Sequence, residues 1–249
     1  MKNNSKKVAT PKNTNTQTAM LTKEKRYQDL VNKRKKCKEC AQWGFINQSQ
    51  INGGKFDKEM VIGAWSLWQG SLDAKVLVVG QDWGNEVSYI KQEGKPVADG
   101  GLTNGNLIKL FSSIGIPVNP PGLEQNPDLF FTNAVLCLKQ GGLTDKIRRK
   151  CYNNCYELFL KELISIIEPQ VIITLGKNAY QSVARIYGLK VEPFSVLVDR
   201  VIADQKPVEL TKHKWLLPAP HCGPLGLAFR NFDKQQQLWK AIHPIVKTN

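Results

Sequence analysis

The sequence predicts an α/β protein, a three-layer α/β/α sandwich around a central, mainly parallel sheet of four strands. Two observations support this prediction: short, uninterrupted apolar runs recur along the chain, and a segment with helical periodicity follows each of them. Continuous apolar runs are typical of strands that are buried on both faces, as the strands of a parallel sheet are. Strands that alternate with helices form βαβ units, which build a doubly wound sheet.

Four apolar runs are the predicted strands: KVLVVG at 75–80, LFFTNAV at 129–135, QVIITLG at 170–176 and KWLLPAP at 214–220. The predicted helices that follow them, in order, are 106–116, 151–169, 178–189 and 232–246. In an open parallel sheet, ligands bind outside the carboxyl ends of the strands. We therefore expect Asp82, Asn133 and His221, which lie at or just beyond these ends, to meet at one edge of the sheet.

Charge and composition limit the class of partner. The 249-residue chain carries 35 basic and 21 acidic residues, a net charge of +14. Such an excess favours a polyanionic partner, above all nucleic acid, and the alternative is a solvated basic surface. No run of about 18 apolar residues is present, so no membrane span is expected. The polar N-terminus lacks the apolar core of a secretion signal, so we expect a cytoplasmic protein. We also expect it to be associated with the nucleoid and to be a monomer.

The chain divides into a tail and one predicted domain. Residues 1–22 are rich in Lys, Asn and Thr and poor in large apolar groups, so they are predicted to form a disordered basic tail. Residues 23–249 are predicted to form a single α/β domain, which begins with the basic helical stretch 23–40. No internal repeat is present.

Three side chains at the predicted sheet edge are weak signals when each is taken alone. An Asp after a strand is more often a helix cap or turn former, an Asn can cap a turn, and a lone His is more often structural than catalytic. Each of them, however, stands in a longer motif. The motifs are VLVVGQDWG around Asp82, FTNAVLC around Asn133 and PHCGPLGLAFRNF around His221.

These three motifs, together with PQVIITLGKNAYQSV at 169–183, resemble the signature segments of the uracil-DNA glycosylase superfamily. The first resembles the water-activating Gly-Gln-Asp-Pro-Tyr motif, the second the Asn-Ala-Val-Leu strand that reads uracil, and the third the His-Pro-Ser-Pro-Leu-Ser loop that enters DNA. The fourth resembles the iron–sulfur, thermophile-type enzymes. The resemblance covers residues 25–245 and implies an enzyme of base excision repair that hydrolyses the N-glycosidic bond of uracil flipped out of DNA.

The resemblance also implies a role for each motif residue. Asp82 would orient water and stabilise the sugar cation, and His221 would donate a hydrogen bond to uracil O2 as charge develops there. A fixed amide at Asn133 matches uracil, which offers an acceptor at O4 and a donor at N3, and it opposes cytosine. The residues implied to bind the substrate beside Asn133 are Gln81, Gly84 and Leu102, and those implied to contact DNA are Gly223, Pro224, Leu225 and Arg230.

The sequence departs from the family pattern where base selection is concerned. Trp83 stands in place of the motif proline, and Gly84 replaces the tyrosine that excludes the methyl group of thymine. Exclusion of thymine is then expected from Glu86 or Tyr89. The stacking phenylalanine is absent, and Leu102 is the candidate at its position. The alternatives are therefore a glycosylase for another deaminated base, such as hypoxanthine, and a catalytically idle nucleic-acid-binding protein on the same fold.

Six cysteines in a chain without a secretion signal favour metal or cluster ligands, or free thiols, over disulfides. Cys37 and Cys40 form a CxxC pair, and spacing alone slightly favours zinc. The resemblance instead implies a structural 4Fe–4S cluster, with zinc the alternative. Its implied ligands are Cys37, Cys40, Cys137 and Cys155. Cys151 lies one helical turn before Cys155 and is the other candidate for the fourth ligand.

Overall fold

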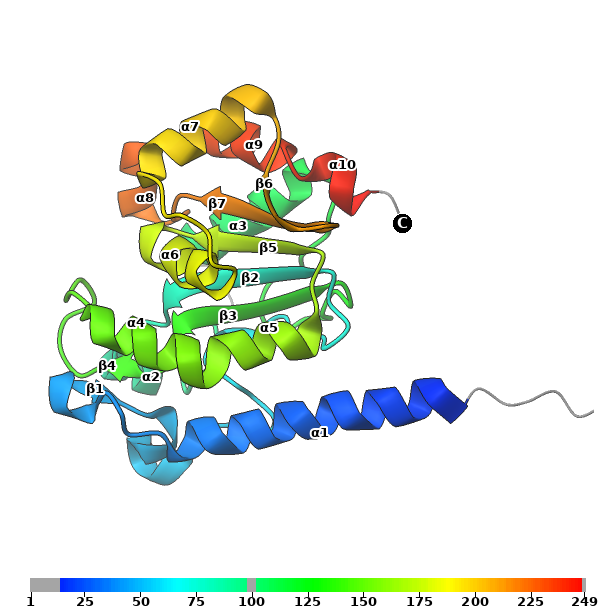
Figure 1. The fold of residues 1–249 in the computed structure, drawn as a ribbon. Helices are drawn as coiled ribbons and strands as arrows, with labels where there is room; N and C mark the ends of the chain where they lie inside the picture. The colour runs from blue at the N-terminus through cyan, green and yellow to red at the C-terminus, as the bar shows by residue number, and fades with distance from the viewer. Residues whose placement is uncertain (1–13, 98–101, 248–249) are drawn as a thin grey trace, which may run out of the picture.

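The computed structural model describes residues 14–97 and 102–247 and has a five-stranded sheet at its centre (Figure 1). The strand order is β3-β2-β5-β7-β6. The bounds are β2 (Val76–Asp82), β3 (Leu129–Val135), β5 (Val171–Leu175), β6 (Val208–Thr211) and β7 (Lys214–Ala219). The strands β3, β2, β5 and β7 are parallel to one another, which confirms the predicted mainly parallel α/β fold.

The sheet has one strand more than the four that the sequence predicts. The additional strand, β6, pairs antiparallel with β7 through a tight turn at residues 212–213. Leu210 is its one buried residue, so the strand lacks the continuous apolar run that marks the other four. An edge strand with solvent on one side carries only half of the apolar signal of a central strand. The prediction of four strands was wrong for this reason.

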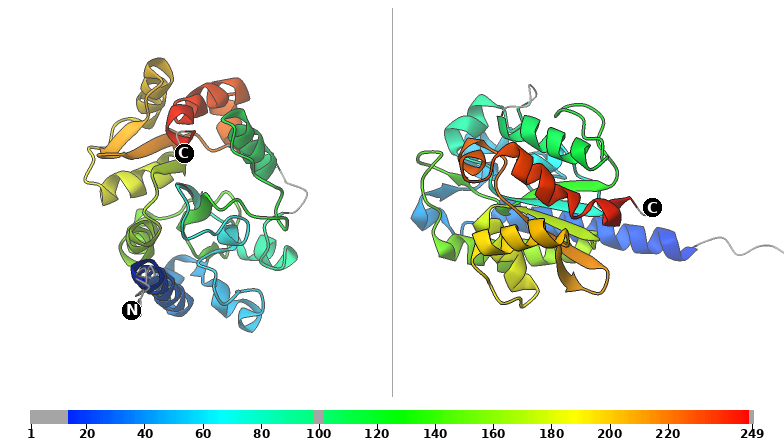
Figure 2. Two further views of the ribbon diagram at one scale, coloured as in Figure 1. Left: turned by 90° about the vertical axis from the view of Figure 1, so that its right-hand side faces the viewer. Right: turned by 90° about the horizontal axis from the view of Figure 1, so that it is seen from above.

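Helices cover both faces of the sheet (Figure 2). On one face, α3 (Leu102–Ser113) and α9 (Phe232–Lys240) pack against each other, and Phe111 of α3 stacks on Phe131 of β3. The other face is covered by α4 (Arg149–Cys155), a π-helical turn η4 (Tyr156–Leu160), α5 (Lys161–Ile167) and α6 (Lys177–Ile186). All four predicted helices are therefore present, and the predicted helix 151–169 is continuous through a π-turn.

The remaining elements lie at the sheet edges and in the connections. The helices are α2 (Glu86–Lys91), α7 (Phe194–Asp204), α8 (Pro224–Phe229) and α10 (His243–Val246). The shorter turns are η1 (Ala41–Trp43), η2 (Gln48–Gly54) and η3 (Ala64–Leu67). Two short strands, β1 (Phe45–Ile46) and β4 (Leu138–Lys139), form a second, antiparallel sheet beyond the carboxyl end of β3. This small sheet brings Lys139 beside the end of β2. There the backbone N–H of Lys139 donates to the carbonyl oxygen of Gly84.

Helix α1 (Thr14–Lys36) packs against α5 and enters the segment 1–22 that the sequence predicts to be disordered. Residues 1–13 of that segment lie outside the described residues. No Gly or Pro interrupts residues 14–36, so the helix runs without a break from Thr14 to Lys36. Of the helices that the structure describes, none has the length and apolar character needed to cross a membrane.

A buried ion pair ties α1 to the segment that follows it. The Arg34 side chain is 1% exposed and donates to both carboxylate oxygens of Asp57, at 2.7 and 2.8 Å. The amide of Asn47 donates to the carbonyl oxygens of Arg34 and Cys37, at 2.5 and 2.9 Å. A bidentate guanidinium–carboxylate pair has a fixed geometry. These contacts therefore hold the end of α1, and with it Cys37, in one position.

Candidate active site

The carboxyl ends of β2, β5 and β7 line one side of a cavity of about 350 Å³. The residues around it are Gln81, Asp82, Lys139, Leu143, Thr144, Asp145, Leu175, Gly176, His221 and Leu225. The structure thus brings four predicted site residues to one place: Gln81, Asp82, His221 and Leu225. The parallel strands account for this meeting, because their carboxyl ends share one edge.

Asp82 ends β2 as a buried and firmly held carboxylate. Its Oδ1 lies 3.2 Å from Nζ of Lys139, and the two side chains are 9% and 6% exposed. Lys139 Nζ also donates to the carbonyl oxygen of Leu143, at 2.5 Å. On the other side, the amide nitrogen of Gln81 donates to Asp82 Oδ2 at 3.1 Å, and its oxygen accepts from Asn178 at 2.8 Å. Both carboxylate oxygens are therefore fixed in direction.

Lys139 is a site residue that the sequence analysis missed. It stands at the end of an apolar run, where a lysine is usually solvated. Its burial follows from the turn of β4 back toward β2, which the sequence pattern does not reveal. A buried ammonium group needs a charge partner. Asp82 supplies it, so the cation and the carboxylate stabilise each other.

His221 begins the loop between β7 and α8 and is present as a neutral ring. Its Nδ1 accepts a hydrogen bond from the backbone N–H of Gly223 at 3.0 Å, so in the neutral ring the proton lies on Nε2. Burial lowers the pKa of His221 below its ordinary value of 6.5, and the charge of Asp82 opposes that shift. At neutral pH the ring therefore offers an Nε2–H donor beside the carboxylate.

The loop that carries His221 is fixed to α3. The amide of Asn106 donates to the carbonyl oxygen of Cys222 at 2.8 Å, and the Cys222 thiol donates to the carbonyl oxygen of Thr103 at 3.4 Å. A Cβ on Gly223 would lie 2.9 Å from the His221 ring and 2.8 Å from Thr103 Oγ1. Glycine is therefore needed here by close approach, and it keeps the ring in place. Burial raises the pKa of Cys222 to about 12, in keeping with a structural thiol.

Asn133 lies on β3 opposite Gly80 of β2 and does not line the cavity of Asp82 and His221. Its side chain is 5% exposed. A Cβ on Gly80 would lie 2.4 Å from Asn133 Oδ1 and 2.8 Å from the ring of Trp65. Gly80 therefore makes room for a buried amide and an aromatic ring one residue before Gln81.

Other predicted substrate residues lie away from the cavity. Leu102 begins α3 and is 70% exposed, and residues 98–101 before it lie outside the described residues. Gly84 lies beside Leu143 and takes a φ of +132°. Tyr89 is 1% exposed and packs edge-on against Phe56 in a small core. The expectation that Tyr89 could exclude thymine was therefore wrong, because its ring faces that core.

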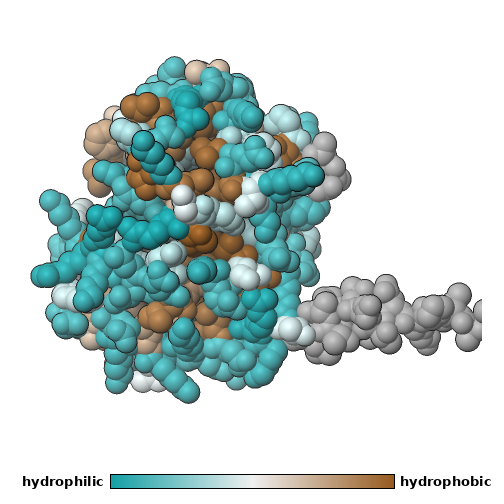
Figure 3. Space-filling view, viewed as in Figure 1, coloured by the Kyte–Doolittle hydropathy of each residue, from teal (hydrophilic) through white to brown (hydrophobic). Residues whose placement is uncertain are grey.

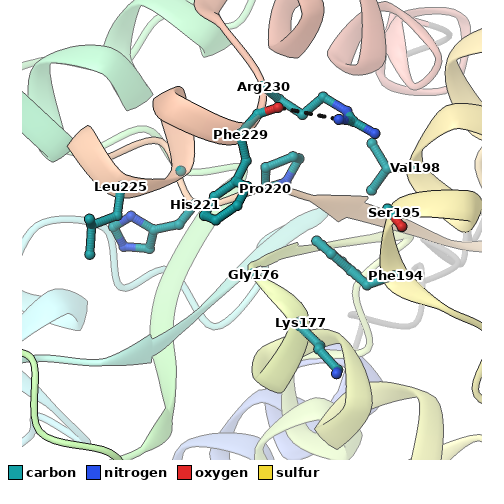
Figure 4. Close-up of a pocket in the computed structure, with 11 residues that line it drawn as sticks. Gly176, Lys177, Phe194, Ser195, Val198, Pro220, His221, Leu225, Phe229 and Arg230 are labelled. Carbon is teal, nitrogen blue, oxygen red and sulfur yellow. Dashed lines mark hydrogen bonds between the residues drawn. The ribbon is translucent and has the colours of Figure 1, made fainter.

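Two of the four predicted DNA contacts, Leu225 and Arg230, line a second cavity, of about 370 Å³, between α7 and α8 (Figure 4). Leu225 and Phe229 of α8 are 73% and 81% exposed, and apolar side chains gather over these helices (Figure 3). Pro224 opens α8 directly after Gly223. Arg230 follows α8, donates to both carboxylate oxygens of Asp199, at 2.7 and 2.8 Å, and lines the cavity. Phe229 is an exposed aromatic residue that the sequence analysis did not select.

Five cysteines gather where the end of α1, the end of β3 and α4 meet. Cys37 and Cys40 follow α1, Cys137 follows β3, and Cys151 and Cys155 lie on α4. The thiols of Cys40 and Cys151 are hydrogen-bond partners, and the pKa of Cys155 is raised by burial first and then by the neighbouring Cys137. The six cysteines of the described residues are free.

The cysteine group fits a thiolate-ligated metal centre in composition, since three elements supply five thiols. Burial raises the pKa of the Cys137 thiol to about 12, so without a metal this side chain is protonated at neutral pH. Across residues 14–97 and 102–247, no three His, Cys, Asp or Glu side chains stand in the arrangement of a metal site. The predicted ligand set therefore stays a prediction.

The parallel sheet thus ends in a fixed carboxylate and a neutral imidazole donor, which line one cavity. The family model described as Uracil DNA glycosylase superfamily matches residues 67–243. The chain therefore belongs to the uracil DNA glycosylase superfamily. Membership implies a DNA-binding hydrolase that removes damaged bases in DNA repair. No curated protein matches the chain.

The protonation of His221 gives the first test. Its folded-state pKa lies below 6.5, so the ring should stay neutral as the pH falls through that value, with the proton on Nε2. The unfolded chain takes up this proton first, so the free energy of unfolding should fall as the pH drops below 6.5. Asp82→Asn should lower the pKa of His221 further, because it removes a charge that favours the imidazolium.

Nitrogen-detected NMR of the imidazole rings measures the pKa of His221 and shows which ring nitrogen carries the proton. The variant His221→Gln assigns the signal. A proton on Nδ1, or a His221 pKa above 6.5 in the intact protein, would show that the ring is not the neutral donor described above.

Proposed function

We propose that the protein removes uracil from DNA by hydrolysing the N-glycosidic bond of a deoxyuridine flipped out of the strand. The observation that carries this proposal is the pairing of Asp82 and His221 across one cavity. Asn133 supports it, because its amide lies one strand away, over Gly80.

Cleavage of the N-glycosidic bond leaves positive charge on the sugar and negative charge on the departing base. Asp82, held by Lys139 and Gln81, supplies a fixed negative charge that orients water and stabilises the sugar cation. His221 donates from Nε2 to the base oxygen on which negative charge develops. Preorganised groups of this kind each lower the activation barrier by about 3–4 kcal/mol.

Asn133 is proposed to select the base. Its amide offers a donor to O4 and an acceptor to N3–H of uracil, and this pattern opposes cytosine. A mismatched buried amide costs on the order of 1–3 kcal/mol. The absence of a tyrosine at Gly84 and the burial of Tyr89 in a separate core favour a wider choice of bases, with hypoxanthine the second candidate.

Excision kinetics under single-turnover conditions test this assignment. On a uracil oligonucleotide, Asp82→Asn and His221→Ala should each lower the rate of excision by about a hundredfold or more, because each removes charge stabilisation. Asn133→Asp should also lower uracil excision, because it removes the amide donor. Asp145→Asn is the matched control: Asp145 lines the same cavity but holds only the turn at Gly142, so its rate should stay close to that of the wild type.

The same assay compares the possible substrates. Oligonucleotides with uracil, hypoxanthine or a thymine mismatch are offered to the wild-type protein. Faster excision of hypoxanthine than of uracil would assign the second substrate. Unchanged rates in both the Asp82 and the His221 variant would refute the active-site assignment, and no excision of any base would favour an idle DNA-binding protein.

We also propose that the protein carries a structural 4Fe–4S cluster, as in the iron–sulfur members of the superfamily. The gathering of thiols from α1, β3 and α4 supports the proposal. Cys37, Cys40, Cys137 and Cys155 would hold the cluster, which would pin the end of α1 to the sheet. None of these cysteines lines the cavity of Asp82 and His221, and the bond cleavage described above does not use the cluster.

Metal analysis tests the cluster. Protein purified without oxygen should be brown and contain about four irons per chain, as Cys-ligated clusters of this type do. Cys137→Ala and Cys155→Ala should lose the iron, whereas Cys151→Ala and the control Cys222→Ala should keep it. Zinc in stoichiometric amount without iron would show that the metal is zinc and not an iron–sulfur cluster. Loss of iron in Cys151→Ala, with iron retained in Cys155→Ala, would make Cys151 the fourth ligand in place of Cys155.

A further inference from the structure

A third cavity, of about 330 Å³, lies between α4 and α6 beside the candidate active site. Its lining is polar and basic: Ile147, Arg149, Tyr152, Asn153, Tyr156, Lys177, Asn178, Gln181, Ser182 and Arg185. Three of these residues are cations, and none is an Asp or a Glu. We refer to this cavity as the basic pocket. Neither base recognition nor bond cleavage, as described above, uses it.

The cations of the basic pocket are not neutralised by the protein. Arg185 is half-buried and donates to the side-chain oxygen of Asn153, and its guanidinium lies 5.9 Å from the centre of the Tyr156 ring. These neutral contacts fix the position of the guanidinium. Within residues 14–97 and 102–247, no ion pair involves Arg185, Arg149 or Lys177. A positioned and partly desolvated cation without a carboxylate favours binding of an anion.

Neutral donors complete the basic pocket. The Tyr152 hydroxyl is buried and makes no well-formed hydrogen bond with the described residues, although the amide of Asn178 lies close to it. Gln181 adds a side-chain amide to the lining, whereas the Ser182 hydroxyl donates to the carbonyl oxygen of Asn178. Guanidinium, hydroxyl and amide donors around a small cavity are the groups that bind phosphate oxygens. The cavity cannot admit a duplex, but one phosphate group with part of its sugar fits it.

The basic pocket is joined to the candidate active site by a short chain of contacts. The amide nitrogen of Asn178 donates to Gln81, which in turn donates to Asp82. Lys177 follows Gly176, which lines the cavity of Asp82. The basic pocket and the cavity of Asp82 are therefore neighbours at the N-terminal end of α6.

We propose that the basic pocket binds one phosphate group of the DNA strand next to the target nucleotide, an inference that rests on the proposed function. Phosphate contacts carry no sequence information, but they fix the register of a strand on a protein. Arg185 would hold the phosphate through its fixed guanidinium, and Arg149 and Lys177 would add charge at the rim. The bound phosphate sets which nucleotide faces Asp82.

The test measures binding and needs no excision. The intact protein is titrated, by fluorescence anisotropy, into oligonucleotides that carry a tetrahydrofuran abasic analogue. In each oligonucleotide, one phosphate near the analogue is replaced by a neutral methylphosphonate. The wild-type protein should bind one of these oligonucleotides about tenfold more weakly than the others, because its methylphosphonate removes a charged hydrogen bond. We call the place of that methylphosphonate the sensitive position.

Variants of Arg185 show whether that position belongs to the basic pocket. Arg185→Gln should weaken binding of the unmodified oligonucleotide about tenfold. In this variant, a methylphosphonate at the sensitive position should cause no further loss, because the substitution and the methylphosphonate remove the same interaction. Arg185→Lys retains the charge and guards against misfolding, so it should recover part of the affinity. Arg148→Gln is the matched control. Arg148 precedes Arg149 in the sequence but does not line the pocket, so its substitution should leave the positional pattern intact.

Three results would overturn the proposal. The first is an Arg185→Gln variant that weakens binding of every oligonucleotide equally and keeps the positional pattern. The second is a wild type without any such pattern. The third is competition by inorganic phosphate in the wild type but not in Arg185→Gln, without any methylphosphonate effect, which would assign the pocket to free phosphate. The binding pattern can be measured even if the protein does not excise uracil. The proposed function and this inference are therefore tested independently.

Discussion

The parallel pairing of β3, β2, β5 and β7 is the constraint on which the rest of the molecule depends. Val76 of β2 pairs with Leu129 on one side and Val171 on the other, and Val171 pairs with Trp215. Because the four strands run in one direction, residues far apart in the sequence reach a single edge. The apolar runs that fill both faces fix this register, since a shift by one residue would move each buried side chain to the opposite face of the sheet, where it would have to repack.

At that edge, burial and hydrogen bonding give two titratable groups opposite tasks. Asp82 is held by Lys139 and Gln81, so a charge is kept at one fixed point. His221 is neutral, because burial disfavours the imidazolium and the Gly223 N–H occupies Nδ1. A fixed charge on one side and a neutral donor on the other match a bond whose two halves develop opposite charge. The space over Gly80 holds the amide of Asn133, which we propose to select the base.

The sequence predicted those features that depend on local pattern and on the direction of the strands. Four strands carry continuous apolar runs, and Asp82 and His221 follow two of them. The features that it did not predict depend on packing between distant segments. Lys139 is buried because β4 turns back beside β2, Tyr89 faces a core formed with Phe56, and the basic pocket exists because α4 packs on α6. The edge strand β6 was missed because only one of its residues is buried.

A crystal structure of the protein with an oligonucleotide that carries a non-hydrolysable deoxyuridine analogue would test the central claim most directly. The account predicts that the uracil leaves the base stack, that its O4 and N3 face the amide of Asn133, and that its O2 lies within hydrogen-bond distance of His221 Nε2. The sugar C1′ should then face the carboxylate of Asp82. A uracil that remains stacked in the DNA, or one that binds with its edge turned away from Asn133 and His221, would contradict it.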